Sequence, residues 1–150
     1  MALTEKILSI MQTWTPETVA ELTGVPYRTL MRWLKSGHVQ ASVAPPRGER
    51  KQVLLSLRDV LEACVAATLR RTGHSMEYIG SLLAQLRRDG ASLEDIYLIV
   101  VDGDLVSVYG SPTDATRLFE EPGQKVILPV AHWRELAQQV AYPKEQVIVA

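Results

Sequence analysis

The sequence lacks the residues and segments on which several classes of protein depend. Only one of its 150 residues is a cysteine, Cys64, which excludes a disulfide framework and a cysteine-rich metal site. A single thiol fits a reducing compartment, so we expect a cytoplasmic protein. No apolar run approaches the ~18–20 residues that a membrane helix needs, which excludes transmembrane helices. The first 14 residues, which include Glu5 and Lys6, do not have the pattern of a signal peptide.

Catalytic and metal-binding motifs are missing as well. His38, His74 and His132 are far apart in the sequence and have no metal-ligand spacing, and the chain has neither a Gly-rich phosphate loop nor a nucleophile elbow. Cys64 lies among apolar residues at helical spacing, where it is best interpreted as a small buried side chain. We therefore predict no enzymatic activity, no metal and no cofactor.

What the sequence does contain is an uneven distribution of charge. Residues 1–90 carry 12 Lys and Arg against 8 Asp and Glu, whereas residues 91–150 carry 4 against 9. Six basic residues lie between positions 28 and 51, with Glu49 as the only acidic one: Arg28, Arg32, Lys35, Arg47, Arg50 and Lys51. A basic patch on a nearly neutral chain indicates that this segment has a polyanion as its partner.

The order of helix and strand signals predicts an α+β protein in three parts. Residues 1–13 have the spacing of a short amphipathic helix. We expect a mainly helical domain over residues 14–90 and a small α+β domain over residues 91–150. In the last part, two β-rich runs at 96–101 and 105–109 flank Asp102-Gly103, which predicts a β-hairpin.

Three further elements are expected after the hairpin. Ser111-Pro112 begins a short helix that extends to Phe119, and residues 126–128 read as a strand. A last helix is expected over residues 132–140, and residues 146–149 are a candidate terminal strand.

A helix-turn-helix pattern begins at Thr15-Pro16, where Thr15 is a plausible N-cap and Pro16 suits the first helical position. Two helices that pack near a right angle need three things. The first helix needs a small residue, the turn needs a residue that accepts a left-handed backbone, and the second helix needs an apolar residue. Ala20, Gly24 and Leu30 supply these in order. The second helix is expected over residues 26–36.

The outward face of that second helix is basic, and it is the expected DNA-reading surface. Arg28, near the N-terminal end, suits a bidentate contact to guanine, whereas Arg32 and Lys35 suit phosphates. Two alternatives are open at this point: Arg28 forms a surface salt bridge, for example to Glu17 or Glu21, and Tyr27 packs on the protein instead of contacting DNA. Trp33 is expected in the core.

A basic β-hairpin, or wing, is predicted next to the reading helix. Residues 39–43 and 52–55 read as its two arms, and the wing over residues 43–53 carries Arg47, Arg50 and Lys51, which are placed to contact the DNA backbone. After the wing, Ser56 and Asp59 have the spacing of a capping box at the start of a long helix. Ser75 caps the helix that follows.

Taken together, residues 14–89 resemble the winged helix-turn-helix DNA-binding domain of the MerR family. The resemblance rests on these stretches: TVAELTGV at 18–25, RTL at 28–30 with Trp33, SG at 36–37, LRDV at 57–60 and LRRTGHSMEYI at 69–79. It implies a regulator that binds palindromic DNA as a homodimer, with the second helix in the major groove and the wing along the backbone. Thr15 joins the expected DNA contacts. Where the family has a long dimerising helix, this chain has Gly90 and the β-rich run at 96–101.

We therefore predict a sequence-specific transcriptional regulator, a homodimer on an inverted-repeat operator in double-stranded DNA, cytoplasmic and nucleoid-associated. Residues 91–150 would dimerise, bind a small-molecule effector or bind a protein partner. The main alternative is an antitoxin-type DNA-binding protein whose C-terminal domain neutralises a partner protein. An architectural DNA binder, like the excisionases that share the winged fold, is a third hypothesis.

Overall fold

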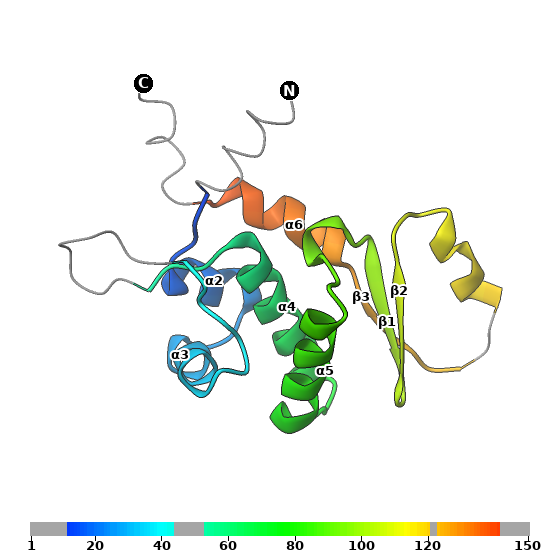
Figure 1. Ribbon diagram of the computed structural model, residues 1–150, viewed down its shortest axis with the longest axis horizontal. Helices are drawn as coiled ribbons and strands as arrows, with labels where there is room; N and C mark the ends of the chain where they lie inside the picture. The colour runs from blue at the N-terminus through cyan, green and yellow to red at the C-terminus, as the bar shows by residue number, and fades with distance from the viewer. Residues whose placement is uncertain (1–11, 44–52, 121–122, 142–150) are drawn as a thin grey trace, which may run out of the picture.

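The computed structural model describes residues 12–43, 53–120 and 123–141, except the side chains of Arg117 and Phe119. Helices come first and a small antiparallel sheet follows, which confirms the predicted α+β class (Figure 1). The elements are α2 (Pro16–Thr23), α3 (Tyr27–Ser36), α4 (Leu57–Arg71), α5 (Met76–Arg88), η1 (Leu93–Asp95), β1 (Leu98–Asp102), β2 (Leu105–Tyr109), η2 (Asp114–Glu120), β3 (Val126–Leu128) and α6 (Val130–Gln139).

Three of the expected elements fall largely outside the described residues. They are the helix over residues 1–13, of which residues 1–11 are not described, the wing tip at 44–52 and the candidate strand at 146–149.

The helix boundaries follow the local signals. Thr15 accepts a hydrogen bond from the backbone of Thr18 and caps α2. Ser56 and Asp59 form the expected capping box at the start of α4. Ser75 caps α5. These side chains satisfy N–H groups that the first turn of a helix leaves without partners, so the starts could be read from the sequence.

Helix α4 is the centre of the structure (Figure 1). Eleven of its fifteen residues are buried. It packs against α2 on one side, α5 on another, and η1, β3 and α6 from the C-terminal half. A single cluster of buried side chains therefore extends from Trp14 to Ala141. The C-terminal α6 covers part of α4, so the two halves of the chain share one core.

The three strands form a sheet in the order β2-β1-β3, with both pairings antiparallel. One face, with Ile99, Val101 and Leu128, belongs to the main core. On the other face, Val100 packs against Ala115 and Leu118 of η2. The sheet is thus covered on both faces at its central strand.

Several boundaries differ from the prediction. The first hairpin strand was expected over residues 96–101, but β1 begins two residues later and ends one residue later, at Asp102. The turn comprises Gly103-Asp104, because Asp102 pairs with Leu105. Gly103 has φ +61, which suits the first position of a two-residue hairpin loop. The helix near residue 114 is a 3₁₀ helix, and the last helix begins at Val130, two residues early.

The expected arm at 39–43 is not a continuous strand. Val43 forms one antiparallel bridge with Leu54, and Leu55 pairs instead with Trp14. No described helix is long and apolar enough to cross a membrane.

Candidate nucleic-acid interface

The turn between α2 and α3 has the geometry that the sequence pattern requires. Gly24 has φ +74, and its N–H donates to the carbonyl of Ala20. A Cβ at Gly24 would approach the guanidinium of Arg71 to 3.1 Å in a backbone conformation that other residues rarely adopt. Leu30 is fully buried, on the side of α3 that faces the core. The helix-turn-helix interpretation of Ala20, Gly24 and Leu30 is consistent with this packing.

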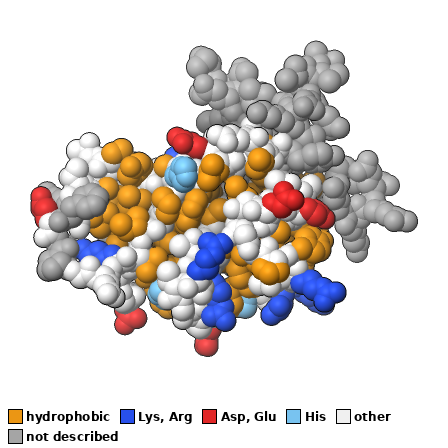
Figure 2. All heavy atoms as spheres, turned by 180° about the vertical axis from the view of Figure 1, so that it is seen from behind, with side chains coloured by type: hydrophobic (Ala, Val, Ile, Leu, Met, Phe, Trp, Pro, Cys, Tyr) orange, Lys and Arg blue, Asp and Glu red, His pale blue; other side chains and the backbone are white. Residues whose placement is uncertain are grey.

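The opposite side of α3 is exposed and basic. Arg28, Arg32 and Lys35 are all exposed, and Tyr27 is 44% exposed. Trp33, three residues after Leu30, is buried as expected. In the view from behind, Lys and Arg side chains gather along the lower part of the molecule (Figure 2). The helical period therefore separates a core side from a cationic side.

The cations of α3 have no carboxylate partner in the part of the chain that the structure describes. Both ion pairs found there are formed by Glu62, with Arg58 and Arg87. The alternative of a salt bridge from Arg28 to Glu17 or Glu21 is not seen among the described residues. Among the described residues, nothing neutralises the three positive charges on this exposed helix face, which would attract an anion.

Thr15 is partly buried at the start of α2, where its hydroxyl is used within the protein. Its Oγ1 lies 2.9 Å from Oγ1 of Thr18 and accepts from the Thr18 N–H at 3.3 Å. The observed role of this side chain is therefore that of a helix cap.

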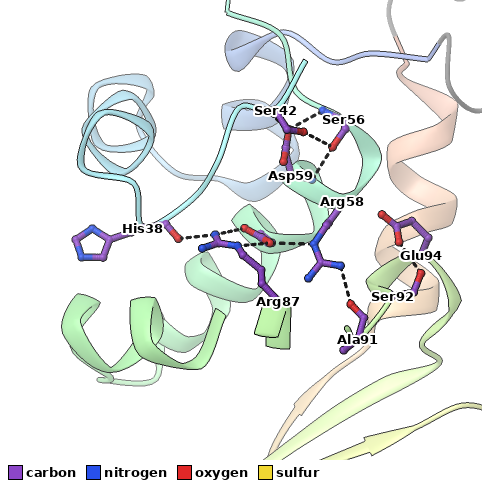
Figure 3. A network of polar contacts seen from close by, with 10 residues as sticks. His38, Ser42, Ser56, Arg58, Asp59, Arg87, Ala91, Ser92 and Glu94 are labelled. Carbon is purple, nitrogen blue, oxygen red and sulfur yellow. Dashed lines mark hydrogen bonds and ion pairs between the residues drawn. The ribbon is translucent and has the colours of Figure 1, made fainter. Parts of the chain in front are cut away.

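The base of the wing is anchored to the start of α4. Oδ2 of Asp59 accepts hydrogen bonds from the Ser42 N–H at 2.7 Å, the Ser42 hydroxyl at 2.8 Å and the Ser56 N–H at 2.9 Å (Figure 3). Asp59 is 2% exposed, and Val43 and Leu54 bridge just beyond these contacts. The two ends of the wing are therefore held together. Arg47, Arg50 and Lys51 lie outside the described residues.

A buried charge cluster, which the sequence interpretation missed, is connected to the loop that follows α3. Glu62 is 1% exposed, and its carboxylate lies 3.2 Å from Nε of Arg58 and 2.5 Å from Nη2 of Arg87 (Figure 3). Arg87 also donates to the carbonyl of His38, in the loop after α3. The hydrogen bond that Arg87 donates to Glu62 raises the pKa of Arg87 above its usual range. The sequence signal that could have indicated this cluster is the four-residue spacing of Arg58 and Glu62, which places the two side chains next to each other on a helix.

Two other contacts fix the ends of α3 on the core. Arg71 of α4 donates to the carbonyl of Thr23, directly before the turn. At the far end, a Cβ on Gly80 of α5 would lie 2.6 Å from Cδ2 of His38, so the His38 ring packs directly against α5 and would have to move to admit a side chain at Gly80. Side chains of the core helices α4 and α5 thus contact the residues that flank α3 at both ends.

The remaining candidate groups have structural roles. Burial raises the pKa of the Cys64 thiol to about 12, so the thiol stays protonated at neutral pH. His74 lies with Nδ1 3.2 Å from the carbonyl of Leu69 at the end of α4. Within residues 12–43, 53–120 and 123–141, no group of three His, Cys, Asp or Glu is placed to hold a metal ion.

Comparison with known proteins finds a family model that matches the same segment. Residues 15–86 match the model of the MerR HTH family regulatory protein, which is 72 of the 150 residues. No curated protein matches the chain. The matched segment runs from the cap of α2 to the last turns of α5, and it contains both the exposed face of α3 and the Glu62 cluster.

Proposed function

We propose that residues 15–86, which match the MerR HTH family, form the DNA-binding domain of a transcription regulator, and that the chain acts as a homodimer on an inverted-repeat operator. The observation that carries the proposal is the exposed side of α3. It presents Arg28, Arg32 and Lys35 without described carboxylate partners, on a helix whose ends are anchored. An exposed cationic helix of this kind suits the major groove, because the groove is wide enough for an α-helix and the phosphates beside it are negative.

The proposed contacts divide into base reading and phosphate binding. Arg28 reads a base, with Tyr27 beside it, because the N-terminal residues of a recognition helix enter the groove most deeply. Arg32 and Lys35, further along α3, bind phosphates. The wing residues Arg47, Arg50 and Lys51 add contacts along the backbone, and Thr15 marks the N-terminus of α2, whose N–H groups favour an anion.

Selection of bound duplexes from a randomised library tests this function. We expect enrichment of an inverted repeat whose two halves are occupied by two copies of the chain. The antitoxin-type alternative predicts instead that a second, different protein copurifies with the chain and is neutralised by it. Recovery of no preferred sequence would contradict sequence-specific regulation.

Arg28→Ala is expected to weaken binding to the selected operator by about 1–3 kcal/mol, roughly 5- to 150-fold, and to relax the preference at one base pair. The physical reason is the loss of two hydrogen bonds to a single base. Fluorescence anisotropy with the operator and its single-base variants measures both effects. Arg88→Ala, which removes another exposed arginine, on α5, is the matched control. An unchanged base preference would remove Arg28 from base reading.

Lys51→Ala is expected to weaken binding to all sequences alike. A phosphate contact carries no base information, and each one lost should reduce the slope of log K against log salt by about 0.9. Titrations on operator and non-operator duplexes at several salt concentrations measure this. A loss confined to the operator would contradict a phosphate role.

A further inference from the structure

The two edges of the sheet are protected to very different degrees. Edge strand β3 has only three residues and lies between Lys125 and Pro129. Edge strand β2 has five residues, Leu-Val-Ser-Val-Tyr, and contains neither a charge nor a proline. Proteins commonly block an edge with short length, lysine or proline, because its free N–H and C=O groups pair readily with another strand. β3 has these features and β2 does not.

Exposed apolar side chains lie on both faces of β2. Val108 pairs with Ile99 and so belongs to the core face, yet it is 47% exposed. Leu105 pairs with Asp102 on the other face and is 65% exposed. A helix packed on one face would leave the other uncovered. A strand added at the edge would cover both, because successive side chains of a strand point to opposite faces.

The β2 sequence is complementary to itself. If two copies pair antiparallel about a two-fold axis at Ser107, then Val106 lies opposite the partner's Val108 and Leu105 lies opposite the partner's Tyr109. No charged side chain faces another within the strand. Residues paired across a continuous sheet must lie on the same face, so the register can shift only by two-residue steps. This register pairs all five residues, and the shifted ones pair fewer.

We propose that β2 is the dimer interface, and that two copies join through it into one continuous six-stranded sheet. The occupant is a second copy of this chain, because the strand is self-complementary and uncharged. This inference rests on the proposed function, because it locates the surface through which the proposed homodimer forms. Helix α3 and β2 lie on opposite sides of the molecule (Figure 1), so the pairing leaves the DNA-reading face uncovered.

Cysteine cross-linking tests the register. Ser107→Cys places two thiols opposite each other at the axis, and mild oxidation should link most of the protein covalently. Leu105→Cys is the matched control. Leu105 is more exposed than Ser107, so its cysteine is the more accessible of the two. In this register, however, the two copies of residue 105 are offset by about 13 Å along the strands, too far for a disulfide. Native Cys64 is buried and does not compete.

A charge placed on the edge tests the interface itself. The wild-type chain should sediment at twice 16.7 kDa. Val108→Lys should raise the dimer dissociation constant about tenfold or more, since a lysine must then be buried in the pairing. Ile127→Lys is the matched control, because Ile127 is 45% exposed on the other edge strand and should leave the dimer intact.

The outcomes separate the interface from the proposed function. A dimer that links through Ser107→Cys but binds no DNA upholds the interface and overturns the regulator. The interface is overturned if the chain binds an inverted repeat as a dimer but the Ser107→Cys and Leu105→Cys variants cross-link to the same extent. It is also overturned if neither variant cross-links. A monomer at all concentrations, a dimer unaffected by Val108→Lys, or a different protein found paired with β2 overturns it as well.

Discussion

Glu62→Gln is expected to lower the free energy of unfolding by about 3 kcal/mol, although the side chain keeps its size. The substitution leaves Arg58 and Arg87 facing each other without the carboxylate between them. Breaking a buried ion pair typically costs about 3–5 kcal/mol. We expect the lower end, because the side chains of the two arginines are 26% and 22% exposed and can partly reach water.

Thermal unfolding followed by circular dichroism measures this loss, which for a chain of this size corresponds to roughly 6–12 °C in Tm. Glu77→Gln on the exposed side of α5 is the matched control and should stay within about 0.5 kcal/mol of wild type. If Glu62→Gln unfolds at the wild-type temperature, the cluster does not stabilise the fold. We also expect weaker DNA binding, because the same Arg87 side chain that pairs with Glu62 donates to the His38 carbonyl in the loop after α3.

Trp14→Ala is expected to destabilise the protein by about 3–5 kcal/mol, the usual range for removing a large buried aromatic side chain. Trp14 is fully buried and connects three parts of the chain. Its backbone pairs with Leu55 at the base of the wing, with N···O distances of 3.0 and 2.8 Å, and its indole N–H donates to the carbonyl of Ala137 in α6 at 2.7 Å.

Trp14→Phe separates packing from the hydrogen bond. It keeps most of the ring but leaves the Ala137 carbonyl without its donor, so we expect a smaller loss of about 1–3 kcal/mol. Urea unfolding measures all variants, and Trp133→Phe, at a partly buried site on α6, is the control. Equal stability of Trp14→Ala and wild type would show that the C-terminal helix does not depend on this contact.

The helix-turn-helix could be predicted because its determinants act over short distances along the chain. Thr15, Ser56 and Ser75 cap helices through atoms three residues away, and Gly24 closes α2 through its own backbone conformation. The hairpin of β1 and β2 was predicted for the same reason, since a two-residue loop pairs neighbouring strands. Strand ends differ from the prediction by one or two residues where pairing between strands sets them. Asp102, for example, was expected in the turn but pairs with Leu105.

The candidate site divides in the same way. The exposed face of α3, with Arg28, Arg32 and Lys35, follows from helical periodicity and was predicted. The supporting cluster was not, because Glu62 and Arg87 are 25 residues apart and meet only when α4 packs against α5. A buried glutamate has no sequence signal of its own, since most glutamates are exposed.

The sequence by itself thus determined the helix-turn-helix, its caps and the cationic side of α3, because these depend on propensity, capping and period within a few residues. Only the tertiary structure decided that the C-terminal part shares the core, through Trp14 and Ala137, which are 123 residues apart. It also decided that β2 remains an unprotected edge. Contacts at such separations depend on how whole elements pack, and no local pattern in the sequence specifies that packing.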